Sequence, residues 1–351
     1  MKSSSRISRG RWSLEGGYVE TQEHLIFTVK GIVHPPDRVI AYLRYIPDPT
    51  GDRIRDGVKY KRVYSFEDQI SIIKSKYPQY MHYDEMWDVE VQSVPIERIV
   101  RVYDPSEGLK KLIKGLNGSD RLAEAAKSFA EELSQASGVD INFMGISGSL
   151  LLSLHKETSD IDFIVYGTSN CIKAREALRK MLAEGRSFRK LDPKYLSELF
   201  SSRSPETPMS YELFVKHETR KVIQGIYRDF IYFIRFIKDL DEINERYGER
   251  RIKNRGSAKV RALVTDDSES IFTPCTYRIK CLNVLEGSVN PNELIEVVSL
   301  RGRFAEQAAK SEIVEIRGKL EEVELRGKRY QRIIIGLPGD YMISLNLKAL
   351  E

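Results

Sequence analysis

The stretch from Met144 to Gly167, MGISGSLLLSLHKETSDIDFIVYG, constrains the fold more than any other part of this 351-residue chain. Its apolar start predicts a short strand that ends at Gly148 and Ser149, where a helix begins. Ten residues separate Ser149 from Asp160, and from there charged and apolar side chains alternate through Asp162 into an apolar run. Because strand side chains alternate between two faces, this pattern predicts a second strand with both aspartates on one face. The stretch therefore predicts a strand, a turn into a helix, and a second strand.

Two carboxylates on one face of a strand repel each other unless a cation lies between them. Mg²⁺ is bound in proteins by one or two carboxylates together with phosphate oxygens. A glycine at position 148 allows close backbone approach, and the free N–H groups of a helix start attract phosphate. The hydroxyl of Ser149 adds a donor. The motif thus predicts a site for a metal-bound nucleotide, whereas solvated residues at the start of a strand are the alternative for an isolated aspartate pair.

These residues resemble the signature of the DNA polymerase β-like nucleotidyltransferase superfamily, in which an apolar residue and Gly-Ser are followed, after a spacer, by Asp-apolar-Asp. The resemblance implies a mixed sheet flanked by helices, two Mg²⁺ ions, and transfer of a nucleoside monophosphate from a nucleoside triphosphate with release of pyrophosphate. More widely, the chain resembles an archaeal family of predicted nucleotidyltransferases, on the stretches TVKGIVHPP, YLRYIPDPTGDR, IFTPCTYRIK and SLRGRFAEQA. The chain has Leu150-Leu151-Leu152 where many minimal and CCA-adding relatives have Arg-Gly, so the resemblance does not extend to them.

The superfamily adds a third carboxylate from a later strand, and this resemblance points to Asp229 in YRDFIYF as the third metal ligand. The alternative interpretation makes Asp229 a turn residue between Tyr227 and Phe230. Glu212 and Asp239 are weaker candidates. The predicted catalytic and metal-binding set is therefore Asp160, Asp162 and Asp229.

Basic side chains near the motif could bind the triphosphate. Lys156 follows the predicted Gly-Ser helix and could approach the phosphates, although a polar residue that ends a short helix is ordinarily at the surface. Gly148, Ser149 and Lys156 are accordingly the predicted nucleotide-binding residues. Arg301 and Arg303 could also bind phosphate, and a solvated hairpin is the alternative there.

The regions around the motif predict an α+β protein of three parts. Residues 1–104 form a β-rich region, in which prolines make continuous helix improbable. Residues 105–255 form the nucleotidyltransferase domain, which includes a helix that begins near Ser119 and ends at Gly138. Residues 256–351 form a β-rich domain that is expected to close as a small barrel or sandwich.

Composition limits the partners and the compartment. The net charge of +5, from 56 basic and 51 acidic residues, is compatible with an RNA or DNA partner without requiring one. No apolar run is long enough to cross a bilayer, and three cysteines match no disulfide or zinc pattern, which favours a cytoplasmic protein. The sequence gives no oligomeric state. An alternative function is a nucleic-acid-binding module on a catalytically weak nucleotidyltransferase scaffold.

Overall fold

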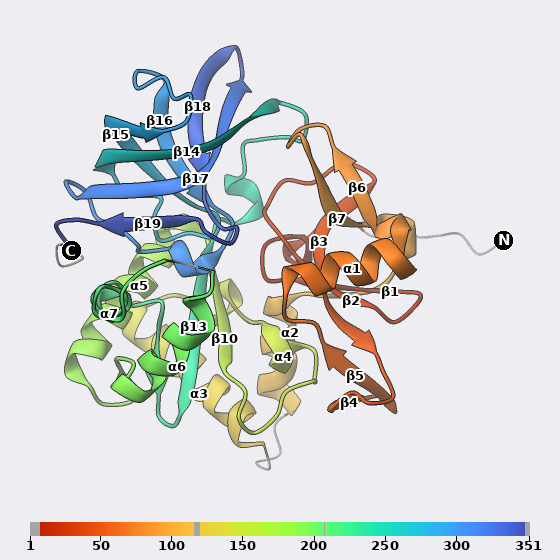
Figure 1. The fold of residues 1–351 in the computed structure, drawn as a ribbon. Helices are drawn as coiled ribbons and strands as arrows, with labels where there is room; N and C mark the ends of the chain where they lie inside the picture. Colours follow the sequence, from red (N-terminus) through yellow and green to blue (C-terminus); the bar gives the residue numbers. More distant parts are fainter. Residues whose placement is uncertain (1–7, 116–119, 207, 348–351) are drawn as a thin grey trace. The chain divides into compact units, whose positions relative to one another are not determined.

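The structure, a computed structural model, describes residues 8–115, 120–206 and 208–347. It combines helices and sheets (Figure 1), so the predicted α+β class is confirmed. The chain divides into two compact units. The first unit consists of Met1–Asp84, Val89–Asn170 and Ile237–Tyr247, and the second of Glu85–Asp88, Cys171–Phe236 and Gly248–Glu351. The predicted division after residues 104 and 255 stays a prediction.

An antiparallel sheet fills the N-terminal part of the first unit. Its order is β4-β5-β3-β2-β1-β8, and β7 pairs with both β3 and β6. The central strand is the ten-residue β3, which pairs with β2, β5 and β7. The strands are β1 (Tyr18–Thr21), β2 (Ile26–Val29), β3 (Arg38–Pro47), β4 (Arg53–Arg55), β5 (Val58–Arg62), β6 (Met81–Asp84), β7 (Val89–Pro95) and β8 (Ile99–Tyr103).

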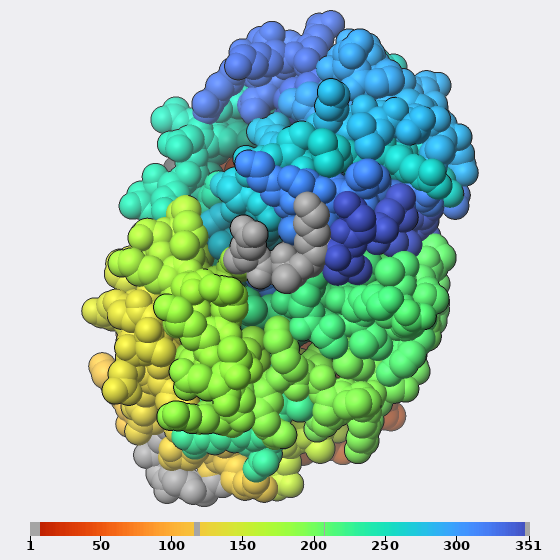
Figure 2. All heavy atoms as spheres, turned by 90° about the vertical axis from the view of Figure 1, so that its left-hand side faces the viewer, coloured from red at the N-terminus to blue at the C-terminus, as the bar shows by residue number. Residues whose placement is uncertain are grey.

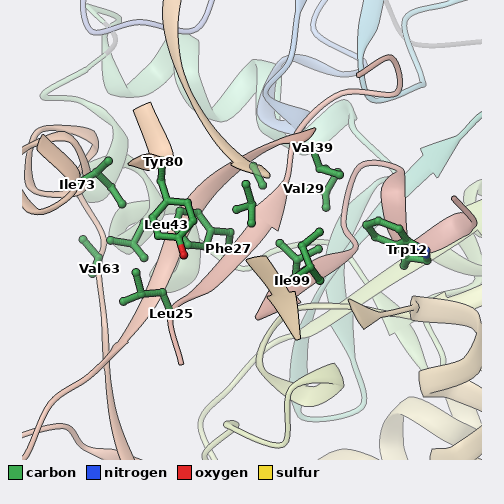
Figure 3. Close-up of a cluster of buried hydrophobic side chains, with 13 residues drawn as sticks. Trp12, Leu25, Phe27, Val29, Val39, Leu43, Val63, Ile73, Tyr80 and Ile99 are labelled. Carbon is green, nitrogen blue, oxygen red and sulfur yellow. The ribbon is translucent and has the colours of Figure 1, made fainter. Parts of the chain in front are cut away.

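A core of buried apolar side chains supports this sheet (Figure 3). Phe27 and Leu43 come from the neighbouring strands β2 and β3, and both are fully buried. The ring of Phe27 lies 5.1 Å from that of Tyr80, centroid to centroid. Because such interiors are densely packed, this core fixes the position of β3.

One α-helix lies within this region, and the β-rich interpretation of residues 1–104 misses it. Helix α1 (Phe66–Lys76) begins at Ser65, whose side chain accepts a hydrogen bond from the backbone N–H of Asp68. Glu67 and Asp68 in its first turn favour the helix start. Serine followed by acidic residues is the local signal that could have found it.

The rest of the first unit contains the predicted strand, turn, helix and strand. The elements are α2 (Pro105–Gly115), α3 (Arg121–Ser137), β9 (Met144–Ile146), α4 (Gly148–Leu151) and β10 (Ile161–Tyr166). Asp120 is the N-cap of α3, whereas Ser119 lies outside the described residues. Gly138 ends α3 in the left-handed conformation, as expected. Helix α3 packs on β10 through Phe129 and Phe163, whose ring centroids are 4.7 Å apart.

The second unit begins with helices and a short antiparallel sheet. Helix α5 (Thr168–Glu184) enters it at Cys171, and the green surface in Figure 2 includes the following helices α6 (Pro193–Arg203) and α7 (Tyr211–Arg220). Strand β12 pairs with β11 and with β13. These strands are β11 (Phe188–Arg189), β12 (Gln224–Tyr227) and β13 (Phe230–Ile237).

A ring of five strands forms the C-terminal part of the second unit. The pairing runs β14-β15-β16-β18-β17 and returns to β14, with only β16 and β18 parallel, and β19 pairs with β17. The expected barrel-like closure is confirmed, and the strand order is that of the OB barrel. The strands are β14 (Arg250–Asp266), β15 (Cys275–Glu286), β16 (Leu294–Ser299), β17 (Ile313–Leu325), β18 (Lys328–Ile334) and β19 (Tyr341–Ser344).

Two expectations from composition concern membranes and cysteines. Within the described residues, no helix is long and apolar enough to span a bilayer. Cys171 and Cys275 are buried free thiols, and Cys281 is a half-buried one. Burial raises the pKa of Cys275 to about 12, so this thiol is protonated and unreactive at neutral pH.

Candidate functional site

The two halves of the sequence motif meet at Gly148 and Asp162. Gly148 opens α4 with φ at +61°, a conformation that favours glycine. A methyl group on its Cα would lie 2.1 Å from Oδ2 of Asp162. The backbone N–H of Ser147 donates to the carbonyl of Asp162 at 2.8 Å. Both the backbone conformation and the contact with the carboxylate therefore require glycine at position 148.

The other motif residues surround this contact. Ser149 is the second residue of α4 and is buried. Asp160 directly precedes β10 and is exposed, whereas Asp162 lies within the strand and is half-buried. From Phe163 onward β10 is buried at every position, beyond the single apolar face that the alternation predicts. The two carboxylates thus lie at the polar beginning of a buried strand.

The short length of α4 changes one argument from the sequence. With four residues, α4 has little of the macrodipole that a long helix presents to phosphate. Attraction for phosphate at this turn then rests on the individual N–H groups and on the hydroxyl of Ser149. A phosphate group at this turn would need cationic partners nearby.

The aspartate pair fits Mg²⁺ when a substrate supplies the remaining ligands. In the described part of the chain there is no cluster of three or more His, Cys, Asp or Glu side chains able to hold a metal ion. Mg²⁺ commonly keeps waters and is bound through one or two carboxylates plus substrate phosphates. The hard oxygen donors of Asp160 and Asp162 match this mode of binding.

The third predicted ligand, Asp229, lies in the turn between β12 and β13. It is exposed, and its neighbour Arg228 has a positive φ of 52°. The turn position agrees with the alternative interpretation, and the metal-ligand role of Asp229 stays a prediction. The two weaker candidates have structural partners: Glu212 accepts from Lys216 on α7 at 2.7 Å, and Asp239 accepts from Nε of Arg11 at 3.1 Å.

Lys156 forms an ion pair with Asp52, which precedes β4. Its neighbour His155 pairs through Nε2 with Oδ2 of Asp120 at 2.7 Å. These two contacts link the loop between α4 and β10 to the segment before β4 and to the N-cap of α3. A phosphate would therefore compete with Asp52 for Lys156. The nucleotide-binding role of Lys156 stays a prediction.

Arg301 and Arg303 both pair with Glu206, at 2.8 and 2.9 Å. Burial lowers the pKa of Arg303 to about 10, and the charge of Arg301 acts in the same direction. Gly302 between them lies against Phe233, because a methyl group there would be 2.9 Å from Cζ of that ring. Glu206 thus pairs with both arginines, while Nε and Nη2 of Arg303 are buried without a hydrogen-bond partner among the described residues.

Sequence reasoning missed that the N-terminal sheet packs against the motif. Tyr18, Tyr45 and Tyr60 of this sheet form one buried cluster with Leu152 and Leu154, which follow α4. The carbonyl of Leu154 accepts a hydrogen bond from Arg53, and that of Leu152 accepts one from Arg55 at 3.4 Å. The sheet therefore forms a wall beside the Gly-Ser turn.

Two arginines of this sheet interact electrostatically with the aspartates. Burial lowers the pKa of Arg44, and the charge of Arg62 lowers it further, while the carboxylate of Asp162 acts in the opposite direction. Burial also acts to lower the pKa of Arg62, but nearby tyrosines and the carboxylate of Asp160 raise it above its usual value. In the sequence, both arginines have the pattern of ordinary solvent-facing strand residues. Nothing in that pattern indicated that they lie near the motif.

A separate cavity of about 420 Å³ opens on the first unit, and no motif residue lines it. Burial lowers the pKa of His34 in its wall to about 4, so this histidine is neutral. The lining residues are Arg9, Ile32, Val33, His34, Pro36, Glu245, Arg246 and Tyr247. The cavity is thus distinct from the motif.

Comparison with known proteins places the chain in a family. It is 35% identical over 328 residues to a protein of the archaeon Methanocaldococcus jannaschii named Uncharacterized protein MJ1086, across 91% of this chain and 94% of the relative. The chain belongs to the family of that protein. No family model matches the chain, and no solved structure matches it significantly. Family membership therefore assigns no activity to the chain.

Proposed function

We propose that the chain is a metal-dependent nucleotidyltransferase that moves a nucleoside monophosphate from a nucleoside triphosphate to a hydroxyl acceptor, with RNA or DNA as one acceptor class. The observation that carries the proposal is the contact between the carboxylate of Asp162 and the Cα of Gly148. It brings a hard-cation ligand to the turn where backbone N–H groups and the Ser149 hydroxyl are available to phosphate. The resemblance of these residues to the polymerase β-like signature supports the same conclusion.

The reaction requires few groups from the protein. The acceptor oxygen attacks the α-phosphorus, a new P–O bond forms, and the bond from the α-phosphorus to the bridging oxygen breaks. Pyrophosphate leaves with that electron pair, and the hydroxyl proton passes to water. Asp160 and Asp162 would hold Mg²⁺, which neutralises the developing charge on the phosphates. Ser149 would orient the phosphate chain, so positioning and electrostatics supply the catalysis.

Labelled substrate tests the proposal. The chain is incubated with Mg²⁺, each α-labelled nucleoside triphosphate, and bulk RNA, DNA or a cell lysate, and the label is followed into product. We expect transfer by the wild type and a loss of roughly 100-fold or more in Asp162→Asn, the scale on which removal of one charge-stabilising group acts. The control is Asp56→Asn, at an exposed turn position with φ of 51° that asparagine tolerates. Equal transfer by Asp162→Asn and the control would refute the metal-ligand role.

A nucleic-acid-binding module with little catalysis is the second candidate. Two observations favour it: the second unit has a barrel of the strand order found in oligonucleotide-binding proteins, and Asp229 lies exposed in a turn. Fold analogy alone does not assign function. A rise in the thermal midpoint with nucleoside triphosphate that requires Mg²⁺ supports the enzyme, whereas stabilisation by single-stranded RNA alone supports the module.

A further inference from the structure

Arg44 and Arg62 lie side by side on neighbouring strands of the N-terminal sheet. The carbonyl of Arg44 accepts a hydrogen bond at 3.0 Å from the N–H of Val63, the residue after Arg62. On its other side β3 is bulged, because Ile26 pairs with Tyr45 and Phe27 with Leu43, which leaves Arg44 without an opposite residue. A bulge turns a side chain away from the regular alternation, and bulges recur beside active sites.

The guanidinium of Arg62 retains one unused hydrogen-bond donor. Nε of Arg62 is buried and has no hydrogen-bond partner among the described residues. The guanidinium of Arg62 is held over the ring of Tyr64, 4.8 Å from its centroid. Two like charges that repel each other in a partly buried place are unfavourable unless an anion joins them. Their arrangement is therefore suited to an anionic ligand.

The neighbourhood indicates which anion. The strand that bears Arg44 also bears Tyr45, which packs in one cluster with Leu152 and Leu154 beside the Gly-Ser turn. Each arginine interacts electrostatically with one motif aspartate, Arg44 with Asp162 and Arg62 with Asp160. A Mg²⁺ ion on the aspartates would neutralise them, which leaves both guanidinium groups free for phosphate oxygens. Arginine is the side chain best shaped for two-point phosphate contacts.

We propose that Arg44 and Arg62 bind the phosphate chain of a metal-bound nucleoside triphosphate beside Asp160 and Asp162. The inference rests on the proposed function for the identity of the ligand. It assigns a substrate-binding role to the N-terminal sheet. The sheet supplies positive charge for the phosphates, which the four-residue helix α4 is too short to provide through its dipole. The acceptor would then approach from the side of the α-phosphate, away from the arginines.

Binding of inorganic tripolyphosphate and of each nucleoside triphosphate, with Mg²⁺, is measured by calorimetry on the whole chain. The variants are Arg44→Gln, Arg62→Gln and Arg62→Lys, and the matched control is Arg278→Gln on the barrel surface, where Arg278 pairs with Glu296 at 2.8 Å. We expect the Kd for both ligands to rise roughly 10- to 100-fold in each glutamine variant, the range for loss of a charged hydrogen bond. Arg62→Lys retains the charge and should lose less, and the control should bind as the wild type does. Thermal midpoints of all variants are recorded to confirm folding.

The outcomes separate this inference from the proposed function. Arginine-dependent binding without any transfer of label supports the inference and refutes the enzyme. Transfer of label with unchanged binding in both glutamine variants supports the enzyme and overturns the inference. Glutamine variants that lose single-stranded RNA binding but bind tripolyphosphate as the wild type does would also overturn the inference, because the arginines would then hold the acceptor. Failure of the folded wild type to bind tripolyphosphate or any nucleoside triphosphate would overturn it as well.

Discussion

The N-terminal sheet and the C-terminal barrel are both β-rich and both rich in arginine, but one arginine of each differs in what it contacts. In the barrel, Arg332 is 1% exposed, donates through Nε to Glu321 at 2.8 Å, and lies over the ring of Trp87 at 5.3 Å. In the sheet, Arg62 keeps a buried Nε without a hydrogen-bond partner among the described residues and interacts with a motif aspartate. Each arginine keeps one buried nitrogen without a hydrogen-bond partner among the described residues, so the difference lies in their carboxylates. Arg332 pairs with a buried glutamate of its own barrel, whereas Arg62 interacts with an aspartate of the motif.

Strand pairing accounts for this difference. The barrel closes into a ring, so neighbouring strands on its wall provide partners for one another's charges, as β17 does for Arg332 of β18. The N-terminal sheet is an open sheet whose central strand β3 is bulged at Arg44. A bulge changes the direction of a side chain, so the irregularity in β3 sets the direction of Arg44.

The largest expected effect comes from removing Arg332, compared with removing Arg62. Arg332→Met leaves Glu321 buried with a weakened ion pair and should lower the free energy of unfolding by about 3–5 kcal/mol. Arg62→Met removes a charge whose aspartate partner is exposed. This variant should change the free energy of unfolding by less than about 1 kcal/mol. Urea unfolding is followed by fluorescence of Trp87 in the second unit and Trp12 in the first, each in a variant with the other tryptophan replaced by phenylalanine. An equal loss of unfolding free energy in both variants would show that the two arginines do not differ in their structural role.

A pH titration compares the units through one buried histidine in each. Burial lowers the pKa of His34 in the first unit and of His217 in the second to about 4. The unfolded chain binds more protons than the folded one between pH 6.5 and 4, so stability is full above pH 6.5 and falls as the pH drops through this window. The loss should reach about 2 kcal/mol per histidine at pH 5.

The matched variant for this titration is His34→Gln. His34 donates through Nε2 to the carbonyl of Ser13 at 2.7 Å and accepts through Nδ1 from Ile40 N–H at 3.2 Å, and a glutamine amide offers both a donor and an acceptor. The variant should flatten the acid dependence reported by Trp12 and leave that reported by Trp87 unchanged. An unaltered acid dependence in both reporters would mean that His34 is not the group that titrates.

The smallest expected effect compares a glycine of the site with a glycine of the barrel. Gly148 and Gly327 both have positive φ, at 61° and 77°, so alanine at either should cost about 1 kcal/mol in stability. Alanine at 327 meets open space, whereas alanine at 148 would displace the carboxylate of Asp162. Of the two variants, we therefore expect only Gly148→Ala to lower nucleotide transfer. Equal transfer activity in the two variants would show that the Gly148–Asp162 contact has no role in the reaction.

Much of the local structure could be predicted from the sequence. The alternation around Asp162 predicted β10, the Gly-Ser pair predicted the turn into α4, and Gly138 predicted the end of α3. Each of these signals acts over a few residues, because backbone preference and side-chain alternation are local properties. Helix α1 carried such a signal at Ser65 and was missed among strand-like neighbours.

Only the tertiary structure decided which charges meet the motif. Arg44 precedes Asp162 by more than a hundred residues, and its direction depends on how β2 pairs with β3 around the bulge. Likewise, the barrel closes only because β14 pairs with both β15 and β17. Such pairings are chosen by the packing of whole strands against one another, so a residue's own neighbours in the sequence do not reveal them. The sequence by itself determined the aspartate motif and its local strands, and the long-range pairing of β3 determined that two arginines stand beside it.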